Sequence, residues 1–238
     1  MAHNPEAYLS DAFTARGIGT WHKLYLRFLE DDPGIEILDV GAGSPDFLKA
    51  VSARRRMALD VSDLFRADFE TAGIAFCKAD IECDPIDDLG RFDVIVCSDV
   101  FEHLVSPQVA LDKITRALRP EGVLFAHVPN EFRLGHMVRV MLGRGESLRF
   151  HRNQEEWTDP HLRRFTEVGF RKFLSTAFRF NLRLHDLKYG RRNRILQRLL
   201  GDVPYCLQPG PTYVSTNSEA TWERYHELKR RLAAMGRK

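Results

Sequence analysis

Acidic residues follow several short apolar segments in this sequence, and two glycines follow the first of them. Asp39 lies in the segment 35–40, which leads into Gly41-Ala42-Gly43, and Asp60 and Asp80 each end a later segment. Two glycines one residue apart after a buried strand favour a tight turn that lets the backbone approach a ligand. Carboxylates at such positions accept hydrogen bonds from ribose hydroxyl groups. These residue types and this spacing predict a site for a nucleotide-like cofactor.

The residues after Gly43 favour a cofactor without phosphate groups. The dinucleotide fingerprint G-x-G-x-x-G requires a third glycine where this chain has Asp46. Pro45 lacks a backbone N–H, and a carboxylate at a helix N-terminus repels a pyrophosphate. Ser44 is expected to cap this helix and Pro45 to be its first residue. S-adenosylmethionine, which has an adenosine, an ammonium and a sulfonium group, suits an acid-lined turn of this kind.

Strands and helices alternate along residues 35–130, and this alternation determines where the candidate residues lie. The apolar runs predict strands at 35–40, 57–60, 74–79, 92–97 and 123–128, a helix after the first strand and another over 105–118. The pattern is typical of an α/β fold with a Rossmann-like, doubly wound, mostly parallel sheet and helices on both faces. Parallel strands end at one edge of their sheet, so we expect the ligand crevice at that edge.

Further segments are expected around this sheet. Residues 1–34 form an N-terminal helical segment whose apolar stripe packs on the sheet, and residues 35–238 form the main domain. Residues 131–165 interrupt the alternation and are expected to be an insertion after the fifth strand that overhangs the crevice. The remaining patterns predict a helix at 166–177, a half-buried strand at 179–187, a last strand at 213–216 and an amphipathic helix at 219–235.

Several motifs occur together, in order, between residues 35 and 130. They are Leu38-Asp39-Val40-Gly41-Ala42-Gly43-Ser44, Asp60, Asp80-Ile81, Phe92-Asp93-Val94-Ile95, Asp99-Val100-Phe101-Glu102-His103-Leu104 and Leu118-Arg119-Pro120-Glu121-Gly122-Val123-Leu124. In these motifs the chain resembles the class I S-adenosylmethionine-dependent methyltransferases, in particular their small-molecule branch. It differs from them in one place, because the family usually has a third glycine where Pro45 stands.

The resemblance also implies roles for individual residues. Asp39, Gly41 and Gly43 would hold the methionine part of S-adenosylmethionine, Asp60 the ribose, and Asp80 with Ile81 the adenine. We expect four neighbouring residues to line the same cofactor site: Ala42, Val61, Ser98 and Asp99.

Two histidines are the candidates for a general base. Methyl transfer from a sulfonium is an in-line displacement, and a hydroxyl acceptor benefits from a base that takes its proton, a role that histidine suits at neutral pH. His103 follows the fourth strand. His161 begins His161-Leu162-Arg163-Arg164-Phe165-Thr166, which is similar to an H-x-R-x-F-T stretch of the family's small-molecule branch. We therefore predict His161 and His103 as catalytic residues, with Thr166 as the N-cap of the next helix.

A metal-assisted reaction is an alternative. Asp99, Glu102 and His103 form D-x-x-E-H, which resembles the E-x-x-E-H metal motif of some small-RNA 2′-O-methyltransferases and of quinone-precursor O-methyltransferases. Carboxylate and imidazole groups at these steps suit a divalent cation, with His127 as a candidate fourth ligand. Relatives that use no metal also have Glu-His-Leu after the fourth strand, however, and Asp is shorter than the Glu of the motif. The prediction is therefore a reaction without a metal.

The insertion is rich in arginine, which suggests what it recognises. Its arginines, at positions 133, 139, 144, 149, 152, 163 and 164, outnumber its acidic residues. Guanidinium groups pair with carboxylate and phosphate groups, so we expect a polar or anionic acceptor such as a glycan, a sugar nucleotide or a carboxylate. Arg163, Arg164 and Asn130 are predicted to bind this acceptor.

Composition narrows the class of protein. The 238 residues are 44% apolar, enough for a sizeable core, and the net charge of +2 argues against a general nucleic-acid binder and against DNA as a partner. The apolar runs are too short to cross a bilayer, and the first twenty residues include Glu6, Asp11 and Arg16 and contain no secretory apolar segment, so we expect a cytoplasmic protein. The cysteines show no C-x-x-C spacing and are expected to be reduced.

The predicted function is S-adenosylmethionine-dependent methylation, with O-methylation of a small-molecule or glycan-type polar acceptor. Two alternatives stay open. One is a catalytically silent S-adenosylmethionine-binding subunit that serves a partner protein, and the other is an RNA methyltransferase, because the arginine clusters could hold phosphates.

Overall fold

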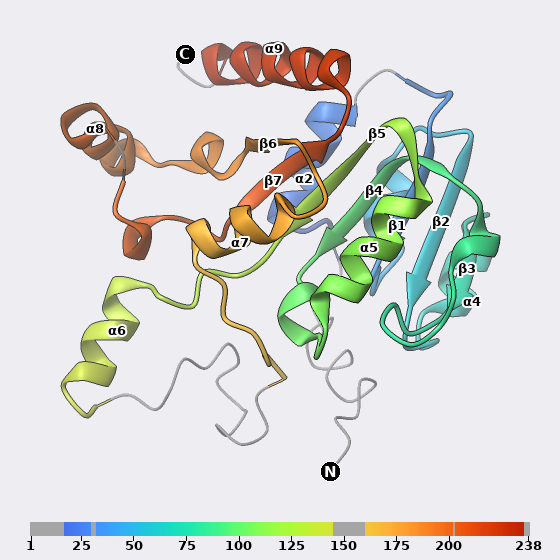
Figure 1. Ribbon diagram of the computed structural model, residues 1–238, viewed down its shortest axis with the longest axis horizontal. Coiled ribbons are helices and arrows are strands. Elements are labelled where there is room, and N and C mark those ends of the chain that lie inside the picture. Colours follow the sequence, from blue (N-terminus) through green and yellow to red (C-terminus); the bar gives the residue numbers. More distant parts are fainter. Residues whose placement is uncertain (1–16, 30–31, 145–159, 202, 236–238) are drawn as a thin grey trace.

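A seven-stranded sheet lies at the centre of the protein (Figure 1), whose computed structural model describes residues 17–29, 32–144, 160–201 and 203–235. In spatial order the strands are β3 (Ala75–Lys78), β2 (Arg55–Asp60), β1 (Glu36–Val40), β4 (Phe92–Ser98), β5 (Leu118–His127), β7 (Thr212–Thr216) and β6 (Phe180–Arg183). Strands β1 to β5 pair in parallel with one another, whereas β7 is antiparallel to both β5 and β6. This arrangement confirms the prediction of a mostly parallel α/β sheet.

The register of the parallel strands places their carboxyl ends at one edge of the sheet. Val40 pairs with Cys97 across β1 and β4, and Ser98 pairs with His127 across β4 and β5. The strand order reverses between β1 and β4, because the chain passes from β1 to β3 and then returns to the other side of β1. In sheets of this kind a ligand crevice opens at such a reversal, outside the carboxyl ends.

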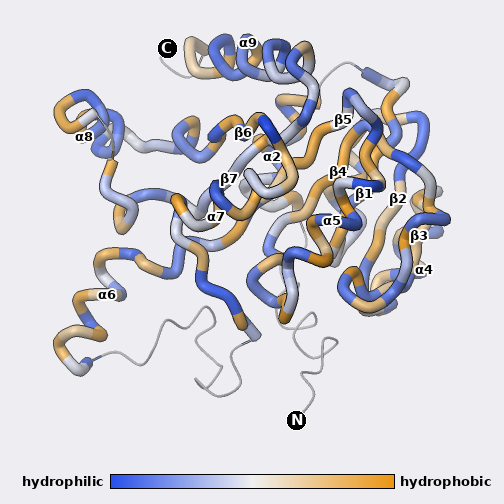
Figure 2. Tube along the Cα trace, viewed as in Figure 1, coloured by the Kyte–Doolittle hydropathy of each residue, from blue (hydrophilic) through white to orange (hydrophobic). Residues whose placement is uncertain are grey.

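Helices cover both faces of the sheet, as expected. α2 (Thr20–Leu29), α3 (Asp46–Ala50), α4 (Arg66–Thr71) and α9 (Glu219–Met235) contribute to the core on one face, and α5 (Pro107–Ala117) and α7 (Glu167–Leu174) to the core on the other. The strands between these layers form the hydrophobic centre of the trace in Figure 2. β4 is an almost continuous apolar run, because side chains on both of its faces are buried.

The expected apolar stripe of the N-terminal segment is confirmed. Leu24, Tyr25, Phe28 and Leu29 of α2 are buried. The rings of Tyr25 and Phe28 lie 4.9 and 6.2 Å from the ring of Phe125 in β5, measured between centroids. α2 therefore belongs to the core of the sheet. The helical expectation for residues 1–16 lies outside the described residues.

α6 (Leu134–Met141) and α8 (Arg191–Leu200) project beyond the β6 edge of the sheet, on the left of Figure 1. One-turn helices complete the described chain: η1 (Asp87–Leu89), η2 (Phe101–His103), η4 (His185–Lys188) and η5 (Tyr205–Leu207). Of the insertion expected at 131–165, residues 145–159 lie outside the described part. Among the helices in the described ranges, none combines the length and apolar character needed to cross a bilayer.

The start of the first sheet-covering helix differs from the prediction. Ser44 is not its N-cap; Pro45 occupies that position and α3 begins at Asp46. Gly43, with a φ of +55°, extends the turn by one residue. The other predicted cap is confirmed, since the backbone N–H of Gly169 donates to Thr166 Oγ1 at 3.0 Å.

Two strand boundaries differ from the prediction by more than two residues. β5 begins at Leu118 rather than Val123, because Leu118 already pairs with Phe92 ahead of a bulge. The strand predicted at 179–187 ends at Arg183, since that residue pairs with Tyr213 near the beginning of β7 and the chain then turns into η4.

Candidate active site

The glycine turn after β1 is held closely against the neighbouring strands. The Gly41 N–H donates to the carbonyl of Leu59 at 2.8 Å, and the φ of Gly41 is +68°. A Cβ at position 41 would lie 2.3 Å from Cγ2 of Val100, the residue that follows β4 by two positions. Both the positive φ and this contact require glycine, so the turn passes directly beside the crevice at the strand reversal.

Asp60 fixes the same turn from the end of β2. Its Oδ2 accepts the Gly43 N–H and its Oδ1 accepts the Ser62 N–H, both at 2.9 Å. Burial raises the pKa of this carboxyl above its ordinary value. Each oxygen retains acceptor capacity for one more donor, so Asp60 holds the turn and still suits a ribose hydroxyl.

Asp39 is a buried carboxylate without a full set of partners. The residue is only 2% exposed, and its Oδ2 has no hydrogen-bond partner among the described residues. Burial, and then the charge of Asp60, raise its pKa well above the ordinary value. A buried carboxylate with one unpartnered oxygen beside the glycine turn fits a cationic ligand group such as the ammonium of S-adenosylmethionine.

A cavity of about 310 Å³ lies between this turn and the ends of β2 and β4; we call it the cofactor cavity. The predicted cofactor residues in its wall are Gly41, Asp60, Val61, Asp80, Ile81 and Asp99, whereas Asp39 is not part of the wall. Ala42 and Gly43 belong to the turn beside it, and the hydroxyl of Ser98 instead lies 3.1 Å from that of Tyr25 in α2. Glu82, which had no predicted role, also lines the cavity and accepts the N–H of Val105.

A second cavity, of about 640 Å³, lies beside the first; we call it the acceptor cavity. Its wall comes from five separate parts of the chain: Thr20, Trp21, Asp99, His127, Pro129, Asn130, Glu131, Arg133, His136, Lys188, Pro209 and Gly210. Asp99 is the residue that lines both cavities. A group bound in one cavity is therefore adjacent to a group bound in the other at this side chain.

Asp99 and His127 face each other where the cavities meet. Asp99 adopts a positive φ of 56°, and its Oδ1 lies 3.5 Å from His127 Nε2. Although half of its side chain is open to the cavities, the surrounding protein raises the pKa of Asp99 to about 6, and nearby His161 acts in the opposite direction. Burial lowers the pKa of His127 to about 3, so this imidazole is neutral at neutral pH.

The hydrogen bonds around His127 assign its tautomer. The Thr212 hydroxyl donates to the carbonyl of Gly210 at 3.0 Å, so it accepts the Nδ1–H of His127, which lies 2.8 Å away. Nε2 then has a lone pair that faces the Asp99 carboxylate. Two acceptors that face each other are suited to a donor between them, and a substrate hydroxyl group is such a donor.

The predicted catalytic histidines lie in a neighbouring buried cluster. His161 is 3% exposed, and its Nδ1 is hydrogen-bonded to Glu131. His103 Nδ1 lies 3.2 Å from the carbonyl of Pro160, and the two histidine rings are in edge contact with centroids 4.7 Å apart. His103 lines the cofactor cavity. His161 is not in the wall of the acceptor cavity, but its hydrogen-bond partner Glu131 is.

The same cluster has a donor set that suits a divalent cation. Ligand atoms of Glu102, His103 and His161 all lie within 4.8 Å of one another. Neither carboxylate oxygen of Glu102 has a hydrogen-bond partner from another described residue, and burial raises its pKa well above the ordinary value. The structure thus groups His161, instead of the predicted Asp99, with the other two candidate ligands.

The three predicted acceptor residues do not all lie in the acceptor cavity. Asn130 lines the acceptor cavity, although its Nδ2 donates to the carbonyls of Tyr205 and Gln208. Arg163 donates to the carbonyl of Val105, and Arg164 Nε lies 3.0 Å from Glu131 Oε2. Neither arginine is in the cavity wall.

Other residues of the acceptor cavity had no predicted role. Arg133 was noted only as part of the arginine-rich insertion, and Trp21 lies in the N-terminal helical segment, for which only packing on the sheet was predicted. The one sequence signal that Glu131 lies at the site was its position directly after the predicted residue Asn130. Lys188 gave no signal, because only the fold brings it to this cavity.

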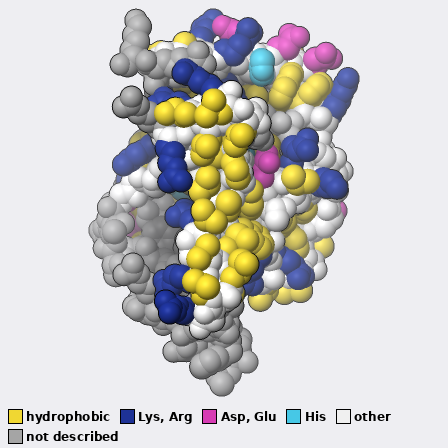
Figure 3. Space-filling view, turned by 90° about the vertical axis from the view of Figure 1, so that its left-hand side faces the viewer, with side chains coloured by type: hydrophobic (Ala, Val, Ile, Leu, Met, Phe, Trp, Pro, Cys, Tyr) yellow, Lys and Arg dark blue, Asp and Glu magenta, His cyan; other side chains and the backbone are white. Residues whose placement is uncertain are grey.

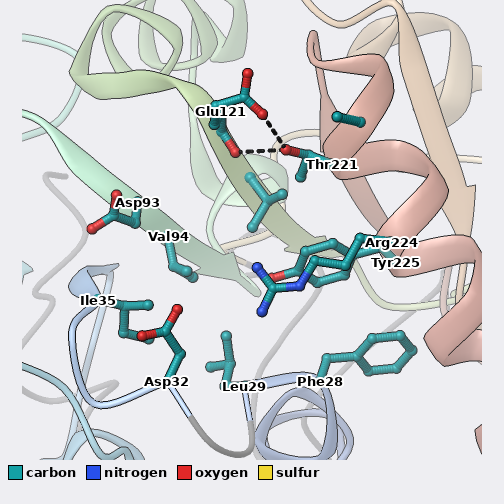
Figure 4. A pocket seen from close by; sticks show the side chains of 12 residues that line it. Phe28, Leu29, Asp32, Ile35, Asp93, Val94, Glu121, Thr221, Arg224 and Tyr225 are labelled. Atoms are coloured by element: carbon teal, nitrogen blue, oxygen red, sulfur yellow. Dashed lines mark hydrogen bonds between the residues drawn. The ribbon is translucent and has the colours of Figure 1, made fainter.

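A third cavity, of about 280 Å³, lies at the opposite edge of the sheet, at the amino ends of β1 and β4 and against α9 (Figure 4). Its acidic residues are satisfied by neighbours: Glu121 accepts hydrogen bonds from the hydroxyls of Ser218 and Thr221, and Asp93 accepts the Glu36 N–H at 2.8 Å. No candidate catalytic residue lies there.

Comparison with known proteins agrees with this geometry. A family model described as "Methyltransferase domain" matches residues 12–179, more than half of the chain. The chain is 27% identical over 108 residues to a ubiquinone biosynthesis O-methyltransferase of Neisseria meningitidis serogroup A, and 29% over 126 residues to its mitochondrial counterpart in Saccharomyces cerevisiae. These matches cover 41% and 48% of this chain and 45% and 40% of the relatives, so the chain matches about half the length of either relative.

Solved structures show the same fold. The plantazolicin methyltransferase BpumL in complex with SAH has a TM-score of 0.59 at 16% identity, covering 91% of this chain and 92% of that one. A putative methyltransferase of Haloferax volcanii, in complex with the Trm112 methyltransferase activator, has a TM-score of 0.54 at 19% identity, covering 84% and 90%. Together with the family model and the glycine turn beside the cofactor cavity, these findings show that the chain belongs to the methyltransferase-domain family, the class I S-adenosylmethionine-dependent methyltransferases.

Proposed function

We propose that this protein transfers a methyl group from S-adenosylmethionine to a hydroxyl group of a small-molecule acceptor. The observation that carries the proposal is the position of Asp99, whose side chain lines the cofactor cavity and the acceptor cavity. Methyl transfer requires the nucleophile and the methyl carbon to be aligned in one place. The junction at Asp99 is such a place, and the partial matches to O-methyltransferases support oxygen as the atom methylated.

The residues of the cofactor cavity, together with Asp39 outside its wall, divide the work of binding. Asp39 and the turn at Gly41 suit the charged methionine part, Asp60 suits the ribose, and Asp80 with Ile81 suits the adenine. When bound, S-adenosylmethionine supplies an electrophilic methyl group: an oxygen–carbon bond forms as the carbon–sulfur bond breaks, and the electron pair stays on sulfur. The protein's part is to align the two reactants and to manage the proton of the hydroxyl.

Asp99 is the best-placed base for that proton. With a pKa of about 6, Asp99 is ionised at neutral pH. This pKa is also close enough to 7 for Asp99 to accept the proton as the acceptor oxygen loses electron density. The single hydroxyl proton is donated to Asp99, and the lone pair on His127 Nε2, 3.5 Å from Asp99 Oδ1, means that no imidazole N–H competes for the carboxylate. His103 and His161 support this pair through the buried cluster, where His161 lowers the pKa of Asp99.

The acceptor cavity suits a ring-containing acceptor with an anionic group. Arg133 and Lys188 are cationic members of its wall, and Trp21 contributes an indole ring that packs on His127 with centroids 4.6 Å apart. Burial, and then the charges of Arg27 and Lys23, lower the pKa of Lys188, and a bound anion would oppose this shift by stabilising the ammonium group.

Calorimetry with S-adenosylmethionine and S-adenosylhomocysteine, followed by turnover against a panel of hydroxylated carboxylates and phosphates, tests the proposal. We expect micromolar binding of both cofactor forms and release of S-adenosylhomocysteine with at least one acceptor. Asp99→Asn should lower kcat strongly and leave acceptor KM nearly unchanged. Binding without turnover across the panel would instead support a catalytically silent subunit.

The unpartnered Glu102 carboxylate favours a second component of the active site, a divalent cation bound by Glu102, His103 and His161. A cation there would lie beside the Asp99 junction and lower the pKa of an acceptor hydroxyl. Elemental analysis of purified protein, together with activity after chelation and after return of magnesium, manganese or zinc, tests it. Full activity in metal-free protein would exclude this component and leave the Asp99 proposal intact.

A further inference from the structure

One face of the protein combines exposed apolar side chains with arginine (Figure 3). It is formed by α6, η5 and α8, and we call it the docking face. No residue of α6 is buried, and Met141 and Leu142 are 82% and 64% exposed. On α8, Leu199 and Leu200 are 74% and 63% exposed. Contiguous apolar surface of this kind marks an interaction site more often than plain solvent-facing surface.

The two helices are parts of one surface, because η5 joins them. The ring of Phe132, which precedes α6, lies 6.2 Å from the ring of Tyr205 in η5. The side chain of Asn193 in α8 donates to the carbonyl of Leu207 at 2.7 Å. Figure 3 accordingly shows the apolar side chains as a band that runs along this side of the molecule, with lysine and arginine beside it.

The charged side chains of the two docking-face helices have one sign. Neither α6 (Leu-Gly-His-Met-Val-Arg-Val-Met) nor α8 (Arg-Arg-Asn-Arg-Ile-Leu-Gln-Arg-Leu-Leu) contains an acidic residue. The exposed arginines on and beside these helices are Arg133, Arg139, Arg144, Arg192, Arg194 and Arg198. Arginine can lie along apolar surface with its stem while its guanidinium reaches an anion. The surface that complements this face is therefore both apolar and anionic.

We propose that the docking face binds the surface of an anionic lipid bilayer, with α6 and α8 lying in the headgroup region. Leucine, valine and methionine would enter the boundary of the acyl chains, and the arginines would pair with lipid phosphates. Helices of 8 and 10 residues cannot cross the bilayer, so the contact is peripheral. RNA would engage the arginines but leave the apolar band in water. A second copy of this chain would oppose arginine to arginine.

The docking face adjoins the acceptor cavity through α6. His136 and Arg133 line that cavity, while Met137 and Met141, on another side of the same helix, are exposed. Docking would thus bring the wall of the acceptor cavity to the lipid surface. The proposal goes beyond the proposed function and does not depend on it, because vesicle binding is measured without turnover.

Co-sedimentation of the full chain with vesicles tests the proposal. We compare phosphatidylcholine alone with phosphatidylcholine containing about a third phosphatidylglycerol, and expect at least about tenfold tighter binding to the anionic vesicles. The double variant Met141→Glu, Leu199→Glu changes two exposed side chains and should reduce this binding by at least about tenfold. Val109→Glu, at a 41% exposed position on α5, is the matched control and should bind as the parent does.

Three outcomes would overturn the proposal. The first is the absence of binding to either vesicle. The second is equal binding by the parent and the double variant, with both shown to be folded by calorimetric S-adenosylmethionine binding and circular dichroism. The third is that light scattering shows the parent to be an oligomer that the double variant dissociates while vesicles do not bind, which would mean that a second copy covers this face.

Discussion

Both edges of the sheet carry cavities lined by acidic residues, but among the described residues only the carboxyl edge has buried carboxylate oxygens without a partner. At the amino edge, Asp93 accepts hydrogen bonds from Arg119 and from the Glu36 N–H, and Glu121 accepts from Ser218 and Thr221, whose hydrogen bonds lower the pKa of Glu121. At the carboxyl edge, burial raises the pKa of Asp39, and one of its oxygens has no partner among the described residues. The same residue type is thus structural at one edge and available at the other.

The difference also appears in the backbone. Asp99, between the two cavities of the carboxyl edge, has a positive φ of 56°, the one such value among described residues other than glycine. Strained backbone and unpartnered carboxylates reduce stability, and they persist where a ligand uses them. The two edges therefore differ in whether the fold gives hydrogen-bond partners to the polar groups near their cavities. Cavity volume alone would not show this difference. This difference also predicts opposite responses to equivalent substitutions at the two edges.

The largest effect is expected at Gly41. Gly41→Ala places a methyl group 2.3 Å from Val100 Cγ2 at a φ of +68°, so the turn must move and cofactor binding should fall by at least about 100-fold in calorimetry. Gly73→Ala is the matched control: its φ of +66° gives the same backbone strain, but no atom lies within 4 Å of the new Cβ. It should cost about 1 kcal/mol of stability and leave cofactor affinity unchanged. Equal affinities of the two variants would contradict the assigned role of the turn.

A second comparison uses Asp39 and Asp93. Asp39→Asn removes a buried, incompletely paired acid, so the unliganded protein should be as stable as the parent or more stable, whereas S-adenosylmethionine affinity should fall by about tenfold or more. Asp93→Asn breaks a partly exposed pair with Arg119 and should reduce stability by about 1 kcal/mol or less, with unchanged affinity. Denaturant titration and calorimetry on both variants measure this. The comparison fails if both variants lose only stability.

The cofactor edge could be predicted from sequence because its signals are local. The two glycines of the turn, and Asp60 and Asp80 at strand ends, are each recognisable within a few residues, and parallel order then brings them together. The exception is Ser98, whose hydroxyl turns toward Tyr25 of α2. Nothing in the strand pattern indicates on which side of β4 an end residue finds its partner.

The acceptor cavity could not be predicted in this way, because its wall is assembled from distant segments. Trp21, His127 and Lys188 meet only after α2 and η4 have packed around the end of β5. Arg163 and Arg164 were predicted as acceptor residues from charge alone, and the fold gives both of them partners within the protein. Composition indicates that arginines are present but not which atoms they contact.

The pH dependence of cofactor binding sharpens the comparison further. Since the pKa of Asp99 is raised from 3.8 to about 6, the native protein holds this proton more tightly than the unfolded chain does. Its contribution to stability is complete below pH 3.8 and is lost as the pH rises through about 6. Binding of the cationic S-adenosylmethionine has the opposite sign, because it favours the ionised carboxylate. Affinity should rise by up to about tenfold between pH 5 and 7.

Asp99→Asn is the control for this pH dependence. It removes the titrating group while keeping the shape of the side chain, so the part of the slope due to Asp99 should disappear. S-adenosylhomocysteine, which lacks the sulfonium charge, should show a smaller slope in the parent. A parent affinity that does not vary between pH 5 and 7 would show that Asp99 does not face the charged part of the cofactor.

The smallest expected effect comes from one substitution made at both edges. Thr221→Val at the amino edge removes a hydrogen bond to Glu121, and Thr212→Val at the carboxyl edge removes the acceptor of the His127 Nδ1–H. Each variant loses one hydroxyl at a buried position, so chemical denaturation should show that the free energy of unfolding falls by about 1 kcal/mol in both. Only Thr212→Val frees the imidazole to change tautomer, which would place an Nε2–H against Asp99, where it competes with the acceptor hydroxyl for the carboxylate. Its kcat should fall severalfold while the kcat of Thr221→Val stays at the parent value; equal kcat values for the two variants would mean that the tautomer of His127 does not affect the acceptor.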